Sequence, residues 1–234
     1  MPKIAIISDV HGNLPALKVV LEKLDEMKPD SWLCLGDIVG YGPDSSECID
    51  IIIEREIPTV IGNHDAAVAG QMSMKFFKNP NKKLLEITRN NLSDEHKLWL
   101  GNLPYTVSNE NLWIASHASP INPQKWMYID SAIKARNVLS NTDFPLVFVG
   151  HTHIPSFVSD QIGILKFLKG YKYLINPGSV GQSRDSDFRA SCCVVDTDNW
   201  EIEFIRAEYN IEKVLTGLSK LGFSRSESHR LIRY

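Results

Sequence analysis

The chain has 234 residues, of which 43% are hydrophobic and 23% are charged, and its formal net charge at pH 7 is -3. This length and apolar content are enough for one sizeable hydrophobic core, so we predict a single domain that spans residues 1–234. Proteins that bind nucleic acids or membrane surfaces usually carry a basic face. The negative net charge therefore argues against a nucleic-acid-binding or membrane-binding protein, although it is compatible with a local basic patch.

The cysteines and the apolar runs indicate a cytoplasmic protein. Cys34, Cys48, Cys192 and Cys193 form no Cys-x-x-Cys pair, and free thiols are typical of cytosolic proteins. The N-terminal apolar run is too short for the core of a signal peptide, and no later run has the length to cross a membrane.

The β-branched residues 3–8 predict a buried strand, followed by a turn and a helix at residues 14–27. The turn contains Asp9 and His11. Alternate residues of an extended chain point the same way, so we expect these two side chains to face one cation while Val10 faces the core. An ordinary turn before a helix would explain Asp9 but would leave His11 without a role.

A second apolar run, residues 32–35, ends at Asp37. It predicts a buried strand that presents this side chain at its carboxyl end, where sites of α/β sheets lie. Gly-Asp is also a common turn pair, so Asp37 gains weight only if other metal-competent residues converge on it. A carboxylate can bridge two cations through its two oxygens, which makes Asp37 the expected centre.

Residues 58–61 predict a third strand, after a helix that begins at residues 44–46 and continues through Arg55. This strand leads to Asn63 and His64. The Asn63 amide offers a neutral oxygen to a metal, whereas its neighbour His64 would point elsewhere and be free for proton transfer. The alternative is that Asn63 is a helix N-cap and His64 is incidental.

Residues 66–101 predict a helical insertion, interrupted near Asn79-Pro80 and restarted by a cap at Ser93. Its basic residues are Lys75, Lys78, Lys82, Lys83 and Arg89. A solvated helix face explains them more simply than a binding surface does.

Two further strands, residues 105–108 and 112–116, lead to His117. The loop at residues 119–130 contains Trp126 and Tyr128, which could form an apolar rim or could simply pack against the core.

A helix at residues 131–140 leads to the apolar strand 146–150 and then to His151 and His153. Two histidines at alternate positions of an extended chain present their rings on one side, a common metal-ligand arrangement. A surface strand with incidental histidines is the alternative. The remainder predicts strands at 156–159, 164–168, 172–175, 190–196 and 200–207 and a helix at 211–221, whereas the tail to Tyr234 gives no clear pattern.

Five of the seven histidines thus fall at predicted strand ends. Up to four of these imidazoles, together with two carboxylates and one amide, could hold two cations, and imidazoles without thiolates suit Mn²⁺, Fe, Co²⁺, Ni²⁺ or Zn²⁺ better than Mg²⁺ or Ca²⁺. Two divalent cations would bring four positive charges, against three negative charges from Asp9, Asp37 and a bridging hydroxide. The positive remainder predicts an anionic substrate, with phosphate esters as the obvious class.

The ordered motifs resemble those of the calcineurin-like metallophosphoesterase superfamily. They are Asp9-x-His11, Gly36-Asp37, Gly62-Asn63-His64-Asp65, His117 and Gly150-His151-x-His153. Gly40-Tyr41-Gly42-Pro43 and the segment from Asn176 to Gln182 resemble the small prokaryotic phosphodiesterase branch, and the match extends to about Arg189. The resemblance implies an α/β fold, a four-layer sandwich of two mixed β-sheets flanked by helices.

The resemblance also implies roles for individual residues. Asp9, His11 and His153 would bind the first metal, Asn63, His117 and His151 the second, and Asp37 would bridge them. Mn²⁺ is the expected ion. A metal-bridging hydroxide would attack phosphorus in line while His64 protonates the leaving oxygen. Tyr41 and Arg184 are the candidate substrate-binding residues, although Ser183 stands where this branch often has proline.

Diesters are the expected substrates, because phosphomonoester dianions usually need several cationic donors and the motifs offer only Arg184. A phosphomonoesterase acting on proteins or nucleotides is the alternative, followed by a nuclease and by a metal-binding scaffold without catalysis. We expect a small phosphate ester as the partner and no membrane. The oligomeric state has no signature in the sequence.

Overall fold

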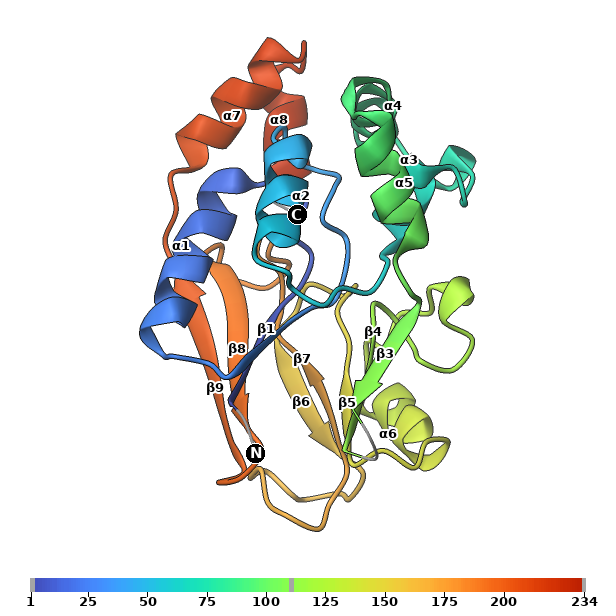
Figure 1. Cartoon of the computed structure of the whole chain (residues 1–234), viewed down its shortest axis with the longest axis vertical. Helices are drawn as coiled ribbons and strands as arrows, with labels where there is room; N and C mark the ends of the chain where they lie inside the picture. The colour runs from blue at the N-terminus through green and yellow to red at the C-terminus, as the bar shows by residue number, and fades with distance from the viewer. Residues whose placement is uncertain (1–2, 110–111, 233–234) are drawn as a thin grey trace.

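The computed structural model describes residues 3–109 and 112–232, and it contains two mixed β-sheets packed face to face (Figure 1). In the first sheet the strand order is β2-β1-β8-β9. The bounds are β1 Lys3–Ile7, β2 Ser31–Cys34, β8 Ala190–Asp196 and β9 Glu201–Ala207. β1 and β2 are parallel, and the other two pairings are antiparallel.

The second sheet has the strand order β3-β4-β5-β7-β6. The bounds are β3 Thr106–Asn109, β4 Trp113–Ser116, β5 Leu146–Phe148, β6 Ser156–Ser159 and β7 Tyr173–Asn176. Its three central strands are parallel, and the two edge strands run antiparallel to them. The expected asparagine turn after β3 includes residues 110 and 111, which lie outside the described residues.

Successive side chains of each strand point to opposite faces of its sheet, so each sheet packs against the other sheet on one face and against helices on the other. Ile4 and Ile6 of β1 pack between the sheets with Phe148 and Tyr173 of the second sheet. The opposite face of the first sheet packs against α1 (Leu14–Glu26) and α2 (Ser45–Glu54). The outer face of the second sheet packs against α6 (Ala132–Ser140). The predicted sandwich is therefore confirmed.

The predicted insertion at residues 66–101, between β2 and β3 in the sequence, is helical, but its helices are interrupted more often than expected. It contains α3 (Asn63–Ala69), the 3₁₀ turn η1 (Met74–Phe76), α4 (Asn81–Asn91) and α5 (Asp94–Asn102). A second 3₁₀ turn, η2 (Pro123–Lys125), lies in the loop after β4. Residues 70–73 and 77–80 are outside helices and lie on the surface of the insertion.

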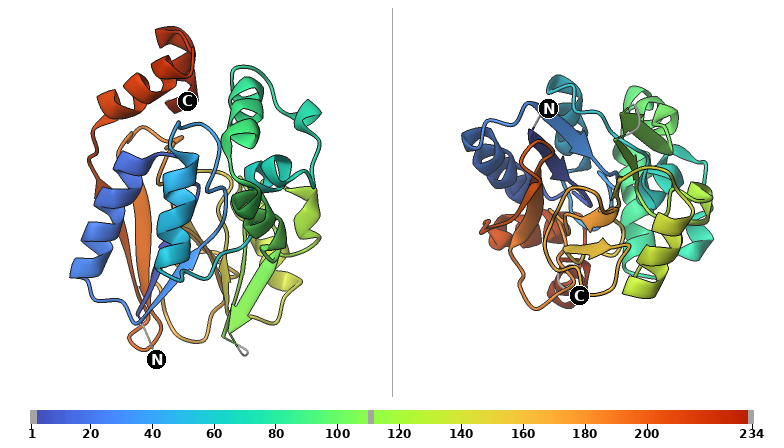
Figure 2. Two further views of the ribbon diagram at one scale, coloured as in Figure 1. Left: turned by 45° about the horizontal axis from the view of Figure 1, so that its top comes forward. Right: turned by 90° about the horizontal axis from the view of Figure 1, so that it is seen from below.

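The C-terminal part ends in α7 (Ile211–Lys220) and α8 (Arg225–Ile232), and α8 was not predicted. Leu231 and Ile232 are buried together with residues of α7 and with Leu84 of α4. Figure 2 shows α7 and α8 beside α4 at the same end of the molecule.

Two predicted strands are wrong. Residues 58–61 form a single bridge, between Thr59 and Cys34, because Pro58 lacks an N–H and the N–H of Ile61 bonds to Pro104 instead. Residues 164–168 form an irregular loop, in which Leu165 is 84% exposed. Tyr173 holds this loop, since its hydroxyl donates to the Lys166 carbonyl and accepts from the Leu168 N–H.

The carboxyl ends of the parallel strands in both sheets meet at one edge of the sandwich. There the chain leaves β1, β2, β4 and β5 in loops that contain the candidate ligands, between the strands and the helical end of the molecule (Figure 1). Within residues 3–109 and 112–232, no helix is long and apolar enough to span a membrane. The four cysteines are free and buried, as expected for reduced thiols.

Candidate active site

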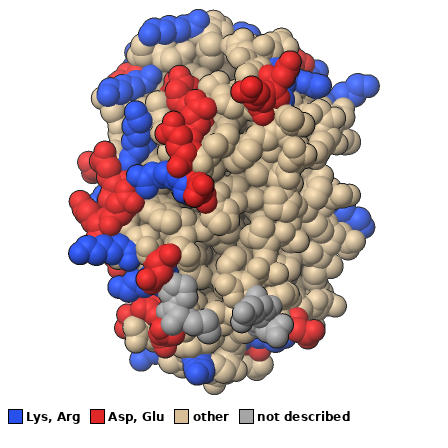
Figure 3. Space-filling view, in the orientation of Figure 1, with Lys and Arg blue, Asp and Glu red and all other residues tan. Residues whose placement is uncertain are grey.

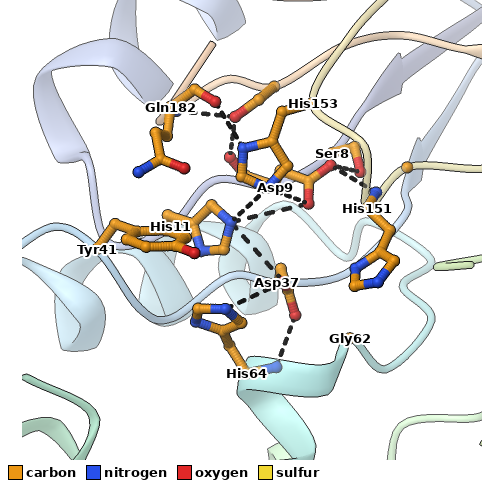
Figure 4. A network of polar contacts seen from close by, with 12 residues as sticks. Ser8, Asp9, His11, Asp37, Tyr41, Gly62, His64, His151, His153 and Gln182 are labelled. Carbon is orange, nitrogen blue, oxygen red and sulfur yellow. Dashed lines mark hydrogen bonds and ion pairs between the residues drawn. The ribbon is translucent and has the colours of Figure 1, made fainter. Parts of the chain in front are cut away.

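The predicted metal ligands and His64 lie together in a buried cluster at this edge, and Figure 4 labels most of them. Each is at most 7% exposed: Asp9, His11, Asp37, Asn63, His64, His117, His151 and His153. They come from four loops and the first turn of α3, which are far apart in the sequence. The convergence leaves the incidental-residue alternatives without support.

One group contains Asp9, His11 and His153. The Nε2 atoms of the two histidines lie 3.1 Å apart, and Asp9 Oδ1 lies 3.2 Å from His153 Nε2 and 3.8 Å from His11 Nε2. These three side chains could hold a metal ion.

A second group contains Asp37, His117 and His151, with Asn63 beside them. His117 Nε2 lies 3.1 Å from His151 Nδ1, 3.2 Å from Asn63 Oδ1 and 3.4 Å from Asp37 Oδ2. The same Asp37 oxygen lies 3.7 Å from His11 Nε2 of the first group. Asp37 therefore faces both groups.

Backbone carbonyls fix the tautomers of four of these histidines. The Nδ1–H groups of His11, His117 and His153 donate to Val39, Leu35 and Gln182 at 3.0, 2.7 and 2.6 Å. In His151 the nitrogens exchange roles, because Nε2–H donates to Trp126 at 3.1 Å. In each ring the other nitrogen faces the cluster, where it can bind a metal once it is deprotonated.

The Asp9 carboxylate has one oxygen committed and one exposed to the cluster. Its Oδ2 accepts hydrogen bonds from Ser8 Oγ at 2.6 Å and from the His151 N–H at 3.1 Å. Its Oδ1 is buried and has no hydrogen-bond partner among the residues that the structure describes. A buried carboxylate oxygen without a partner is costly, and a cation at this position would satisfy it. The donor set therefore fits a metal.

The carboxyl groups are ionised, as metal ligands must be. Burial alone would raise the pKa of Asp9, but attraction to His153, His117 and His11 holds it far below the usual range. Burial alone would also raise the pKa of Asp37, but the surrounding histidines hold it well below its ordinary value.

The imidazoles divide into two kinds. Burial, reinforced by neighbouring histidines, lowers the pKa of His151 to about 3 and places that of His11 well below its ordinary value, so both rings are neutral. Burial also lowers the pKa of His117, but the Asp37 carboxylate raises it to about 9 overall. A cation bound by His117 would therefore compete with a proton.

The local geometry differs from the extended chain that we expected. Asp9, His11, Asp37, His151 and His153 have φ angles between 51° and 66°, in the left-handed region that non-glycine residues rarely adopt. The side chains of Asp9 and His11, and those of His151 and His153, therefore point into the cluster because the backbone bends after each strand ends. Val10 between them is fully buried in the core, as expected.

His64 lies on the other side of Asp37 from the second group. Its ring packs against His11, Tyr41 and Phe77 at centroid distances of 4.7, 4.9 and 4.9 Å, and its Nε2 lies 3.9 Å from Asp37 Oδ2. It could also be a ligand on distance alone, together with His11 and Asp37. Its Nδ1, however, is buried without a hydrogen-bond partner among the described residues, unlike the four carbonyl-fixed histidines. Burial lowers its pKa to about 4.

Gly40 and Gly62 allow this close packing. A Cβ at Gly40, where φ is 119°, would lie 2.3 Å from His64 Nδ1. A Cβ at Gly62 would lie 2.0 Å from Asp37 Oδ1, the oxygen that accepts the His64 N–H at 2.8 Å. Glycine is therefore required at both positions.

Tyr41 and Arg184, the predicted substrate-binding residues, lie together at the entrance. The Tyr41 ring lies 4.5 Å from that of His11, and the Tyr41 hydroxyl accepts a hydrogen bond from Arg184 Nη2 at 3.0 Å. Arg184 Nε donates to Gln182 Oε1 at 3.2 Å. Gln182 also donates to the Leu231 carbonyl of α8, so the C-terminal helix supports this side of the site.

The aromatic side chains of the 119–130 loop also reach the cluster. The Tyr128 ring stacks on His151 at 4.0 Å, and the Trp126 ring lies 6.0 Å from that of His117. Both therefore form a rim of the site, as one of the two interpretations predicted.

Asp65 has a role that the sequence analysis did not assign. Its carboxylate accepts hydrogen bonds from the N–H groups of Asp37 and Gly62 at 2.8 and 3.0 Å and of Ile38 and Val39 at 2.9 and 3.2 Å. Burial and the nearby Asp37 charge raise the pKa of Asp65 to about 7, against the lowering effect of these N–H groups. The sequence could have indicated this role, because an acid at the third position of a helix can accept the backbone N–H of the N-cap residue in a capping box.

The segment after β7 connects two ligand loops. The Ser179 hydroxyl and the Gly181 N–H both donate to the Asp9 carbonyl at 2.9 Å, and Asn176 Nδ2 donates to the Gly150 carbonyl at 2.8 Å. The Asn176–Gln182 motif thus positions the loops that contain Asp9 and His151.

Replacing Asp65 by Asn should weaken metal binding while leaving the fold intact. The amide NH₂ would face backbone N–H groups in place of one carboxylate oxygen, so the Asp37 loop would lose its support. We expect Mn²⁺ affinity, measured by calorimetry, to fall about 10- to 100-fold, as for other residues that orient ligands. Asp196→Asn is the control, because Asp196 also accepts backbone N–H groups but at the opposite end of β1. Equal affinities in Asp65→Asn and the native protein would contradict this role.

Comparisons with known proteins agree with the site. Residues 2–200 match the model of the calcineurin-like phosphoesterase superfamily domain. The chain is 39% identical over 228 residues to an uncharacterized protein of Methanocaldococcus jannaschii, covering 93% of this chain and 92% of that protein. It is 31% identical over 148 residues to the symmetrical bis(5'-nucleosyl)-tetraphosphatase of Proteus mirabilis, covering 60% of this chain but only 54% of that enzyme.

Solved structures show the same architecture. The metallophosphoesterase of Sphaerobacter thermophilus superposes with a TM-score of 0.84 at 37% identity, covering 98% of this chain and 97% of the other. A hypothetical protein of Pyrococcus horikoshii has a TM-score of 0.81 at 20% identity, with the same coverage, and shows the shared fold. The chain belongs to the calcineurin-like phosphoesterase superfamily and is a metal-dependent phosphoester hydrolase.

Proposed function

We propose that this protein is a dinuclear-metal-dependent phosphodiesterase that hydrolyses small phosphate esters by in-line attack of water on phosphorus. The observation that carries the proposal is the position of Asp37, whose Oδ2 lies 3.7 Å from His11 of one group and 3.4 Å from His117 of the other. One carboxylate oriented toward two ligand groups suits two adjacent cations.

The proposed ligands follow the two groups. Asp9, His11 and His153 would hold one ion, Asn63, His117 and His151 the other, and Asp37 both. Mn²⁺ suits this set of oxygen and nitrogen donors, and Fe, Zn²⁺, Co²⁺ or Ni²⁺ are alternatives. When bound, such ions lower the pKa of a water molecule and neutralise charge on the phosphoryl group.

His64 is the proposed acid for the leaving oxygen. Burial lowers its pKa to about 4, so this role requires that the negative charge of the bound ester raise the pKa and protonate the ring. Four other histidines have a backbone carbonyl that fixes one ring nitrogen, but His64 Nδ1 has no such partner among the described residues. Its ring instead packs against Tyr41 and Phe77, with Nε2 3.9 Å from the Asp37 oxygen that faces both groups, where it could reach a leaving oxygen.

The preference for diesters rests on the charges at the entrance. Arg184 is the cationic side chain that the matched motifs bring to the site, and it is already hydrogen-bonded to Tyr41 and Gln182. A diester has one negative charge and a second substituent, which Trp126 and Tyr128 can contact. The symmetrical tetraphosphatases are named for bis(5'-nucleosyl) tetraphosphates, in which each phosphorus is disubstituted and has one negative charge, as in a diester.

The remaining assignments are also proposals. We propose that residues 1–234 are one domain, since β9 and α7 extend beyond the matched residues 2–200 and pack on β8 and α1. A cytoplasmic location remains a prediction. A phosphomonoesterase is the second candidate function, and a scaffold without catalysis is unfavoured by the complete ligand set.

Native protein saturated with Mn²⁺ should contain two ions per chain. Asp37→Ala should retain at most one and lose turnover, because the substitution removes the carboxylate that both groups face. Native mass spectrometry and elemental analysis give the stoichiometry, and Asp50→Ala on α2 is the control. A native protein that stays at one ion in excess Mn²⁺ would rule out the dinuclear proposal.

His64→Ala should keep both ions but lose about 10²- to 10⁴-fold in kcat on esters with poor leaving groups, the usual contribution of acid–base catalysis. Nitrophenyl esters, whose leaving group scarcely needs a proton, should be affected much less. His96→Ala is the control, since His96 pairs with Asp50 outside the site. Loss of a metal ion, or equal rate losses on both kinds of ester, would assign His64 a different role.

In Mn²⁺ the kcat/KM for bis-p-nitrophenyl phosphate should equal or exceed that for p-nitrophenyl phosphate. The reason is the scarcity of cationic donors for a dianion at the entrance. Parallel assays of nitrophenolate release on one preparation make the comparison. A clear preference for the monoester would favour the phosphomonoesterase instead.

A further inference from the structure

A cleft of about 680 Å³ lies beside the metal-binding groups, between the chain after α3 and the 119–130 loop. Figure 1 shows these two segments on the same side of the molecule. Its volume is within the range of about 300–1,000 Å³ typical of small-molecule sites. The lining residues that can stack on a ligand or bond to it are Gln71, Phe76, Tyr105, Gln124, Lys125 and Trp126.

Three aromatic rings line the cleft. Tyr105 and Trp126 form one wall, with ring centroids 5.8 Å apart and an angle of 42° between the planes. Phe76 is 76% exposed although it lies on a short helical turn. A large apolar ring that the fold leaves open to solvent in a cleft is available to stack on a planar ligand.

Both sides of the cleft are connected to the proposed catalytic groups. Trp126 lies 6.0 Å from His117 between ring centroids, and its carbonyl accepts the hydrogen bond from His151. Phe77, the residue after Phe76, packs on His64 at 4.9 Å. A ligand in the cleft would therefore lie next to a phosphoryl group at the metals.

The polar atoms of the cleft suit the edge of a nucleobase. Gln71 donates to the Gly101 carbonyl at 2.6 Å and accepts from the Tyr105 hydroxyl at 3.3 Å, which fixes the aromatic wall. The exposed Gln124 amide can donate and accept at once, the pattern that pairs with a base edge. Lys125 is the charged residue of the lining. In Figure 3 charged side chains gather on the side of α1, and the opposite part of this face has few.

We propose that this cleft is a subsite for a nucleobase, so that the natural substrates are esters of nucleotides. The base would stack between Phe76 and the wall formed by Tyr105 and Trp126, with its edge toward Gln124. This inference rests on the proposed function, because it places the base relative to a phosphoryl group at the metals.

Adenosine 5′-monophosphate and ribose 5-phosphate test the subsite, because ribose 5-phosphate has a hydroxyl in place of the base and is otherwise the same phosphomonoester. Calorimetry with Mn²⁺-loaded protein should give a Kd at least about fivefold lower for the nucleotide, since stacking of one base contributes about 1–3 kcal/mol, equivalent to about 5- to 150-fold. Equal affinities would overturn the proposal.

Phe76→Ala and Trp126→Ala should each raise the Kd of the nucleotide about 5- to 100-fold and leave that of ribose 5-phosphate unchanged. Phe76 is exposed, so its removal should not disturb folding, and Trp126→Phe should restore most of the affinity. Leu165→Ala removes another exposed apolar side chain outside the cleft and is the control. If the control variant weakens the nucleotide equally, or if phenyl phosphate binds as tightly as the nucleotide, the cleft is not a nucleobase site.

This binding assay separates the two proposals. Preferential nucleotide binding that depends on Trp126, in a protein that hydrolyses no ester, would support the subsite and contradict the phosphodiesterase. Turnover of bis-p-nitrophenyl phosphate without preferential nucleotide binding would do the reverse.

Discussion

Four backbone N–H groups donate to the Asp65 carboxylate, and these bonds tie the loop after β2 to the first turn of α3. The tie positions Asp37 directly. It also orients His11, because the Val39 carbonyl that accepts the His11 Nδ1–H belongs to the same loop. In a buried region each lost acceptor costs about 1–3 kcal/mol, so this one side chain restricts the loop more than any surface ion pair could. The geometry on both sides of Asp37 depends on it.

The fold was predictable from the sequence where a short pattern determines burial. The β-branched run that became β1 and the apolar run that became β5 are examples. Prediction failed where a distant group decides. Residues 164–168 read as a strand, but the Tyr173 hydroxyl takes the backbone groups that a neighbouring strand would need. α8 was missed because its apolar contacts, Leu231 and Ile232, come only at the end of a charged segment.

The candidate site was predictable as a set of residues but not as a geometry. Strand ends followed by His, Asp or Asn predicted that His11, Asp37, His117 and their partners would meet, and the described structure brings them together. The expected reason, alternate positions on an extended chain, was wrong. Positive φ angles cannot be predicted from single residues such as His11, because even Asp and Asn, which adopt them more often than other non-glycine residues, do so only occasionally. The backbone carbonyls that orient the histidine rings cannot be predicted from the sequence either, since every residue has one.

The strained backbone explains why so rigid a frame surrounds these loops. Five ligand candidates in the left-handed region would cost about 1–2 kcal/mol each, a sum comparable to the whole stability of a typical domain. Such a conformation persists only if the surroundings determine it completely. Here β1 and β5, the strands that precede four of these five residues, are buried on both faces, and the Asn176–Gln182 segment bonds to the loops from the other side. The ligand nitrogens and oxygens are consequently held in position by the fold itself, so a metal ion entering the cluster has little reorganisation to impose.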